Sequence, residues 1–163
     1  ALAQPALSLS ADGTAGVVET ATDVFGFSAR RGTWATTPRL INTTRFRDDD
    51  WASWYDGVHV LAFSGLRGDF ALQAIGPGSV QHLEELYVLY NTPNTTYGYS
   101  AITGNWSSTS STANTTTRGA DAVALLEGTN VLTAYSATLD VFVSTSTGSS
   151  AAASASYSPV AIA

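Results

Sequence analysis

An aromatic–serine pair recurs along this 163-residue chain at a constant spacing of 36 residues. The four copies are Phe27-Ser28, Phe63-Ser64, Tyr99-Ser100 and Tyr135-Ser136. A second large aromatic residue follows seven positions after the first, at Trp34, Phe70, Trp106 and Phe142. A fixed period of this length is the signature of a repeat architecture, in which each unit is a small supersecondary structure that buries its apolar face against its neighbours.

Within each repeat the residues alternate as expected for short β-strands. The strand that ends in the aromatic–serine pair places its aromatic residue on one face and a small residue on the other. The small residues are Gly26, Ala62, Gly98 and Ala134. A small residue at this position predicts that another backbone or sheet approaches closely. Four short strands with tight turns fill one repeat, so we predict an all-β chain.

The segment Asp23 to Trp34 resembles the second half of a kelch motif, in which an aromatic residue is followed seven positions later by tryptophan. It is also similar to the strand and turn of quinoprotein propeller repeats. The Gly-Gly pair of kelch repeats is absent: Glu19-Thr20 and its equivalents stand near that place. The resemblance implies a β-propeller-like array of four blades over residues 16–147 and transfers no functional residue. A β-solenoid with one coil per repeat is the alternative.

The two ends of the chain align with parts of a repeat. Taking residues 16–19 as a first strand, residues 5–10 align with the fourth strand of a preceding unit, and residues 159–162 with the first strand of a fifth. We therefore divide the chain into an N-terminal half-repeat strand (1–15), a four-repeat domain (16–147) and a Ser/Ala-rich segment (148–163) that ends in a half-repeat strand. The predicted assembly residues are Leu7, Leu9, Val160 and Ile162.

The composition restricts the partners. The net charge is −6 and there is no lysine, which argues against nucleic acid and anionic membranes because both require a basic face. There is no cysteine. No apolar run approaches the roughly 18 residues of a spanning helix.

Export is predicted from the first residues and from the polar composition. The start, Ala1-Leu2-Ala3, resembles the end of a secretory signal peptide. Together with the abundant Ser and Thr, it predicts a secreted or cell-surface protein. Asn-x-Ser/Thr sites, where glycosylation is left open, stand at Asn42, Asn94, Asn105 and Asn114.

Two neighbouring clusters offer ligand chemistry. Asp48 and Asp50 could supply oxygens to Ca²⁺, but no D-x-D-x-D-G loop surrounds them, and a solvated turn is the favoured interpretation. Trp51, Trp54 and Tyr55 follow directly, and tryptophan faces stack on sugar rings. Trp54 occupies an apolar column of the repeat and is assigned to the core, so Trp51 is the stronger ligand candidate.

No catalytic constellation can be located. His59 and His82 have no second histidine at ligand spacing, the nucleophile elbow G-x-S-x-G is absent, and the recurrent serines are typical of turn residues. We predict no enzymatic activity and no required cofactor. The primary hypothesis is an exported structural protein that assembles with itself through its strand ends. The alternative is a propeller-like binding module for an extracellular glycan or protein.

Overall fold

The computed structural model describes residues 8–77, 80–110, 116–128 and 130–147. These residues form sixteen strands in four separate four-stranded antiparallel sheets. We call the sheets blades 1 to 4. Their strands are β1 Ser8–Asp12, β2 Ala15–Glu19, β3 Asp23–Ser28 and β4 Thr33–Pro38; β5 Thr44–Asp48, β6 Trp51–Tyr55, β7 His59–Ser64 and β8 Asp69–Ala74; β9 Val80–Glu84, β10 Tyr87–Asn91, β11 Thr95–Ser100 and β12 Trp106–Ser110; β13 Thr116–Ala120, β14 Val123–Gly128, β15 Val131–Ser136 and β16 Val141–Ser146.

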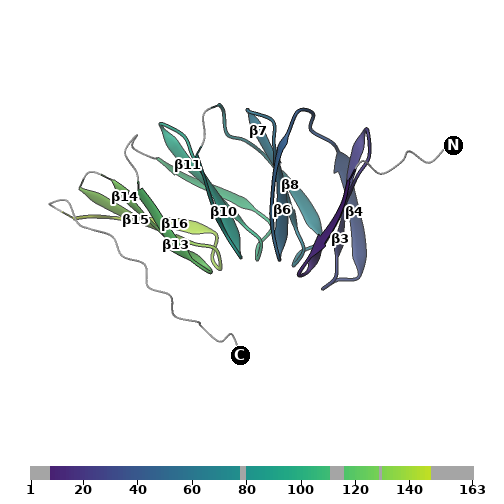
Figure 1. Cartoon of the computed structure of the whole chain (residues 1–163). Coiled ribbons are helices and arrows are strands. Elements are labelled where there is room, and N and C mark those ends of the chain that lie inside the picture. Colours follow the sequence, from purple (N-terminus) through teal and green to yellow (C-terminus); the bar gives the residue numbers. More distant parts are fainter. Residues whose placement is uncertain (1–7, 78–79, 111–115, 129, 148–163) are drawn as a thin grey trace.

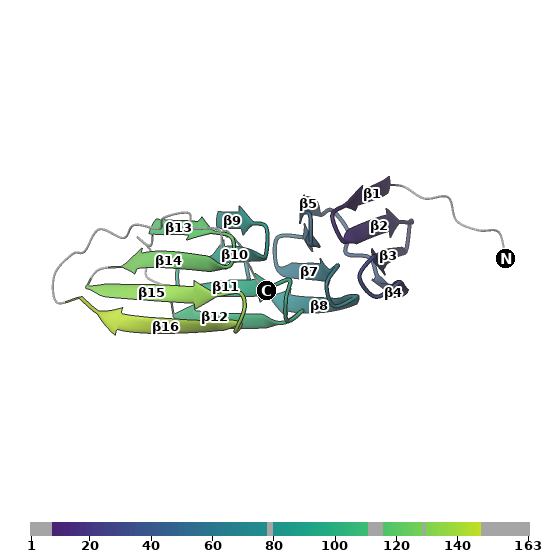
Figure 2. The ribbon, with the colours of Figure 1, turned by 90° about the horizontal axis from the view of Figure 1, so that it is seen from below.

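Each blade is a simple meander in which every strand pairs with the next one along the chain. The four blades stand face to face in chain order and form an open arc (Figure 1). Seen at right angles, the strands of each blade lie one above another (Figure 2). The chain is therefore all-β and propeller-like, as predicted. Each sheet is drawn from one repeat and is antiparallel, which differs from the one-coil-per-repeat solenoid that was the alternative.

The blades begin at a different point of the repeat from the one expected. With residues 16–19 as the first strand of a unit, residues 43–47 are predicted to be its fourth strand. Instead, β5 pairs with β6 and is the first strand of blade 2. In the same way, β1 is the first strand of blade 1, because it pairs with β2, with Leu9 opposite Val18. The described blades thus span residues 8–146, and residues 8–12 do not form a separate half-repeat. The predicted strand at 159–162 lies outside the described residues.

The apolar core lies between the blades rather than within one of them. Three clusters of buried side chains occupy the three junctions, centred on Phe63 between blades 1 and 2, Tyr99 between blades 2 and 3, and Tyr135 between blades 3 and 4. All three are aromatic members of the recurrent pair and are fully buried. Each blade is consequently stabilised by its neighbours, as repeat architectures require.

Glycine and other residues with positive φ set the tight turns after the aromatic–serine strands. Gly32, Gly68 and Gly104 have φ of 66°, 75° and 73°. Asp140 occupies the same place in blade 4 with φ of 52°, which is costly for a residue with a Cβ atom but tolerated by aspartate. Asp140 therefore replaces the glycine of the other repeats without changing the turn.

Candidate functional site

Each internal junction joins two different faces, which we name once for the whole chain. The socket face of a blade carries the small residue and the serine of the repeat. The aromatic face is the opposite side and carries the aromatic residue of the pair. Across each junction the serine hydroxyl donates to a backbone carbonyl of the next blade: Ser28 to Gly65, Ser64 to Ala101 and Ser100 to Ala137. The latter two bonds are 2.5 Å long.

The small residue of the socket face is required by the aromatic ring opposite. A Cβ atom added to Gly26 would lie 2.4 Å from the Phe63 ring, and one added to Gly98 would lie 2.7 Å from the Tyr135 ring. Because both rings are fully buried, neither has free space to move into. The close approach predicted from the small-residue column is therefore confirmed, and the partner is the aromatic residue of the following repeat.

The serine hydroxyls make a direct stability prediction. Replacing Ser64 by alanine is expected to lower the free energy of unfolding by about 1 to about 2 kcal/mol, because the buried Ala101 carbonyl loses its donor. The matched control is Ser136→Ala in blade 4, whose hydroxyl accepts from the Leu139 amide at an exposed turn. The expected cost of that control is at most about 0.5 kcal/mol. Urea unfolding of both variants measures the difference, and equal losses would contradict this role of the recurrent serine.

The aromatic face of blade 1 is not covered by any described residue. Phe27 is half-buried, whereas its three equivalents are fully buried. Ala29 is exposed, whereas Gly65, Ala101 and Ala137 in the same column are buried. The Trp34 side chain is 59% exposed and packs on Phe27, with their ring centroids 5.1 Å apart. Blade 1 thus presents an open aromatic surface.

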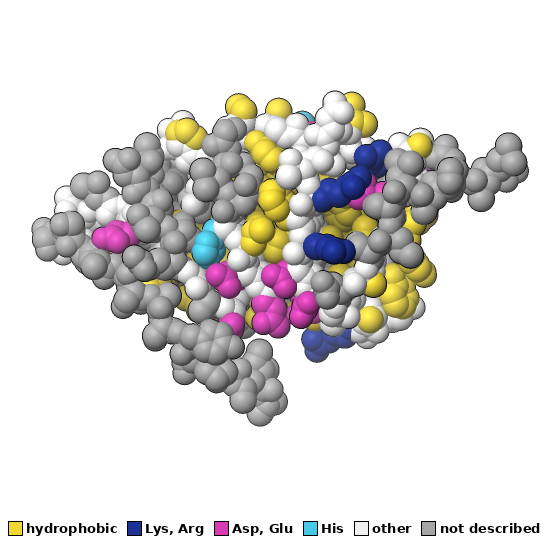
Figure 3. Space-filling model, viewed as in Figure 1, with side chains coloured by type: hydrophobic (Ala, Val, Ile, Leu, Met, Phe, Trp, Pro, Cys, Tyr) yellow, Lys and Arg dark blue, Asp and Glu magenta, His cyan; other side chains and the backbone are white. Residues whose placement is uncertain are grey.

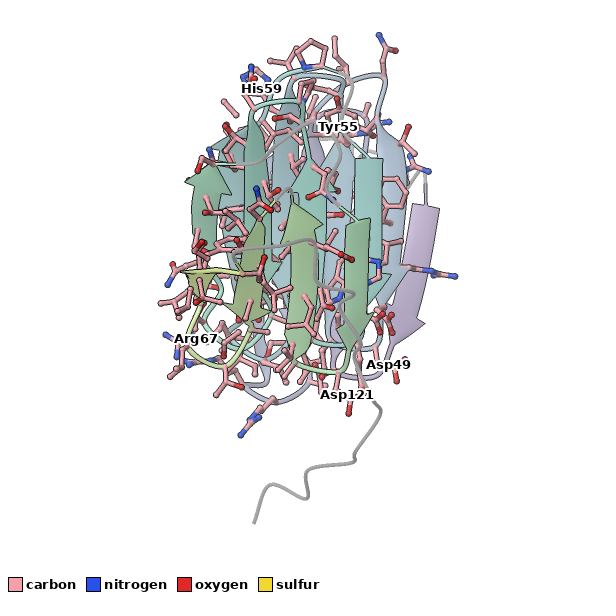
Figure 4. The ribbon with its side chains drawn as sticks, turned by 90° about the vertical axis from the view of Figure 1, so that its left-hand side faces the viewer. Asp49, Tyr55, His59, Arg67 and Asp121 are labelled. Atoms are coloured by element: carbon pink, nitrogen blue, oxygen red, sulfur yellow. The ribbon has the colours of Figure 1, made fainter. Side chains whose placement is uncertain are left out.

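The socket face of blade 4 is also uncovered by the described residues. Figure 4 looks onto the blade 4 side of the molecule. Ser136 and Ala134 are half-buried there, although their equivalents in the other three blades are buried. Val123, Val141 and Val143 surround them with exposed fractions of 46%, 39% and 64%. The two end blades therefore expose opposite halves of the same junction.

The three predicted aromatic ligand residues do not form an exposed platform. Trp51 is fully buried and its indole N–H donates to the Glu84 carbonyl of blade 3 at 2.9 Å. Trp54 is buried, as its apolar column predicted. Tyr55 is half-buried, and its hydroxyl donates to the carbonyls of Gly57 and Gly76. The expectation for Trp51 is corrected: its ring fills the junction between blades 2 and 3 and offers no face to a sugar.

The side chain of Glu19 forms a polar centre between blades 1 and 2. It is only 2% exposed. Its carboxylate accepts the Trp54 indole N–H at 2.9 Å and forms ion pairs with Arg39 at 3.1 Å and with Arg45 at 2.8 Å. Two arginine side chains and one indole N–H satisfy the buried carboxylate, so this cluster joins two blades rather than awaiting a ligand. Sequence reasoning did not identify it, because glutamate does not recur in this column of blades 2 and 3.

Acidic side chains gather at one end of the blades, where the turns β5–β6, β9–β10 and β13–β14 lie (Figure 3). Asp49 and Asp121 are at this end, and His59 is at the opposite end (Figure 4). Partial desolvation, followed by the charges of Asp50 and Asp121, raises the pKa of Glu85. The carboxylates are therefore close enough to repel one another.

The predicted calcium ligands Asp48 and Asp50 lie within this acidic end and have structural roles. Asp50 accepts the Thr14 hydroxyl of blade 1 at 2.6 Å, and Asp48 accepts the Asp49 backbone N–H at 2.8 Å. In the described part of the chain, no group of three His, Cys, Asp or Glu side chains is arranged to hold a metal ion. The favoured interpretation of this segment as a turn agrees with its position between β5 and β6.

The predicted assembly residues are only partly described. Leu7, Val160 and Ile162 lie outside the described residues. Leu9 is in β1, where its backbone pairs with Val18 of the same blade. The strand containing Leu9 is therefore already part of a complete sheet. The exposed residue that sequence reasoning passed over is Trp34; its signal was its place as the first member of the aromatic column.

Comparisons with known proteins found weak structural likenesses and no related sequence. No protein-family model matches the chain, and no curated protein matches its sequence. Among solved structures it is similar to Kluyvelomyces marxianus Hsv2 (4% identity, TM-score 0.39, covering 82% of this chain and 46% of that one). It is also similar to the WD40 domain of SCAP from fission yeast (15% identity, TM-score 0.37, covering 85% of this chain and 44% of that one). A third similar structure is apo AztD from Citrobacter koseri (9% identity, TM-score 0.36, covering 87% of this chain and 47% of that one).

The chain spans a little under half the length of each of these structures. The likeness to kelch and quinoprotein repeats stays a prediction from the sequence. No helix long and apolar enough to cross a membrane occurs among the described residues. What the chain does must therefore be inferred from its own surfaces.

Proposed function

We propose that this chain is a non-catalytic binding module, and that its partners are proteins that dock on the uncovered end faces of the blade stack. The observation that carries the proposal is that blades 1 and 4, at the two ends of the stack, expose repeat positions whose equivalents are covered at the internal junctions. Trp34 and Ala29 are exposed in blade 1, and Val123 and Val143 are exposed in blade 4. Contiguous exposed apolar surface on a soluble protein marks an interaction site more often than an accident of folding.

The occupant that suits these faces is a β-sheet of the same blade type. Such a sheet would bury the aromatic and aliphatic side chains and present a backbone carbonyl to the Ser136 hydroxyl, as the internal junctions do for Ser28, Ser64 and Ser100. Glycan binding is the competing outcome, because an exposed tryptophan also stacks on sugar rings. The secreted or cell-surface location expected from the composition suits either partner.

Fluorescence quenching by acrylamide tests this proposal at Trp34. Of the four tryptophans, Trp51 and Trp54 are buried and Trp106 is half-buried, so quenching in dilute solution should arise mainly from Trp34. The Trp34→Phe variant, which keeps an aromatic ring, supplies the baseline. The probes are the chain itself at rising concentration, the extracellular protein fraction of the source, and a panel of neutral oligosaccharides.

Shielding of Trp34 by a protein supports the proposal. For the extracellular fraction, support requires that the protein is identified and fails to co-elute with a Trp34→Asp variant. Shielding by oligosaccharides alone would replace the protein partner with a glycan and overturn the proposal. Trp34 that stays fully accessible to acrylamide with all three probes would also contradict it.

A further inference from the structure

We propose that the partner is a second copy of this chain, docked head to tail, so that the aromatic face of blade 1 in one copy covers the socket face of blade 4 in the other. This inference rests on the proposed function and names the partner of the same surfaces. In the docked pair the Ser136 hydroxyl donates to the Ala29 carbonyl of the second copy. The contact repeats the internal bonds from Ser64 to Ala101 and from Ser100 to Ala137.

The first argument is that both halves of this contact are already present in the chain. The acceptor column is Ala29, Gly65, Ala101 and Ala137, of which only Ala29 is exposed. The donor column is Ser28, Ser64, Ser100 and Ser136, of which only Ser136 is not fully buried. Each column therefore has one unmatched member, and the two unmatched members are chemically complementary.

The second argument comes from an alternation along the stack. Gly26 faces blade 2, whose edge strand carries Phe70. Gly98 faces blade 4, whose edge strand carries Phe142. Ala62, which is larger, belongs to the core cluster against which Trp106 packs. The socket residue of blade 4 is Ala134, so the alternation calls for a tryptophan on the incoming edge strand. Blade 1 carries Trp34 at this place.

The junction between blades 2 and 3 supplies the detailed template for the pair of copies. There the Trp106 indole N–H donates to the Ala71 carbonyl at 3.4 Å, and Ala71 lies beside Ala62 in the sheet. In blade 4, Val143 lies beside Ala134 in the same register. We therefore expect the Trp34 indole N–H of the second copy to donate to the Val143 carbonyl. The exposed state of both side chains in the single chain is then explained by one contact.

The central strands are matched as well. At each internal junction a residue from the second strand of one blade meets a residue from the second strand of the next. Apolar residues meet at two junctions, Val17 with Trp54 and Leu89 with Leu126. At the other junction the hydroxyls of Ser53 and Tyr90 lie 3.1 Å apart. The corresponding pair between copies is Leu125 with Val18. Two aliphatic side chains are again compatible.

A single chain cannot make this contact with itself. Blades 1 and 4 stand at opposite ends of the arc, with blades 2 and 3 between them (Figure 1). Docking between copies is heterologous, because it joins two different surfaces, and it produces a closed ring or an open stack according to the rotation at each contact. Which one forms is a property of that rotation and not of the contact chemistry.

Cysteine cross-linking tests the geometry, since the chain contains no native cysteine. Ala29→Cys and Ser136→Cys are made as separate single variants, mixed, and treated with a short bis-maleimide. We expect the heterotypic dimer as the dominant product and its loss when Trp34→Asp is added to the Ala29→Cys chain. Ile41→Cys replaces Ala29→Cys as the matched control, because Ile41 is 70% exposed but lies on the connection between blades 1 and 2. That mixture should give no heterotypic product.

Equal yields of homotypic and heterotypic dimers, or none of either, would overturn the head-to-tail arrangement. A Ser136→Cys chain that resists maleimide even in dilute solution would also overturn it, because the socket face would then be covered within one chain. These failures are distinguishable from failure of the proposed function. Shielding of Trp34 by a different extracellular protein without this cross-link would retain a protein-binding module and reject the second copy as its partner.

Discussion

Above about pH 10 the free energy of unfolding is expected to fall steeply, and the chain should unfold cooperatively before about pH 12. Burial raises the pKa of Tyr90 to about 12, and burial also raises the pKa of Tyr87, Tyr99 and Tyr135 above the ordinary range. In the unfolded chain these phenols ionise near pH 10, so above that pH the unfolded state binds fewer protons than the folded state. The stability from the raised pKa values is complete below about pH 10 and is lost as the pH rises towards the folded-state values.

The expected magnitude is about 1.4 kcal/mol per tyrosine for each pH unit, hence roughly 5 kcal/mol per unit for four of them. All seven tyrosines contribute to tyrosinate absorbance in an alkaline titration. The share that belongs to these four buried phenols should appear together with the change in circular dichroism, because they ionise only when the junctions open. Tyr90→Phe is the control: it should reduce the slope by about one quarter. A rise in tyrosinate absorbance that accounts for all seven tyrosines without loss of β-structure would show that the four rings are not held in closed junctions.

Replacing Glu19 by alanine is expected to lower the free energy of unfolding by about 3 kcal/mol, at the lower end of the range for breaking a buried ion pair. The variant removes the acceptor of the Trp54 indole N–H and leaves Arg39, which is 19% exposed, without this carboxylate. The Arg45 side chain is 48% exposed. Because it can return to water, its lost ion pair adds little to the cost. Chemical denaturation followed by tryptophan fluorescence measures the change.

Glu19→Gln separates the two contributions. Its amide oxygen can still accept from Trp54, but the charge that pairs with the two arginines is gone, so we expect a loss between that of Glu19→Ala and wild type. Wild-type stability in the alanine variant would contradict the assignment of Glu19 as the polar centre of the junction between blades 1 and 2.

The strands and their packing could be predicted from the sequence because both depend on properties that recur with the period. The alternation around Phe27 and Gly26 indicated which faces are aromatic and which are small. The structure places a small residue against an aromatic ring at two junctions, Gly26 against Phe63 and Gly98 against Tyr135. The boundaries of the blades could not be predicted in the same way. A period of 36 residues is unchanged by the choice of its first strand, so periodicity sets the length of the unit and leaves its phase open.

A local signal could have settled the phase. Only Asp49 and Asp50 separate β5 from β6, as in a two-residue hairpin, whereas residues 39–43 separate β4 from β5. The shorter connection joins strands of one sheet, and the longer one joins two sheets. The segment was interpreted as a solvated turn, but that interpretation did not distinguish a hairpin within one sheet from a connection between two sheets.

The exposed aromatic residue could not be identified from the sequence for a different reason. Trp51 and Trp34 are both tryptophans in repeated columns, and each column is covered at internal junctions. Trp34 is exposed because it belongs to the aromatic face of blade 1, which no other described blade covers. Its exposure is a property of position in the stack rather than of local sequence, and it appears only once the direction in which each face packs is known.

Sedimentation velocity across a concentration series is the most direct measurement of the central claim, that the end faces are docking surfaces for further copies of the chain. Wild type should shift from monomer to larger species as its concentration rises, while Val143→Asp, which places a charge on the socket face of blade 4, should remain monomeric and folded. A wild type that sediments as a monomer at every concentration, or a Val143→Asp variant that associates equally well, would contradict the account.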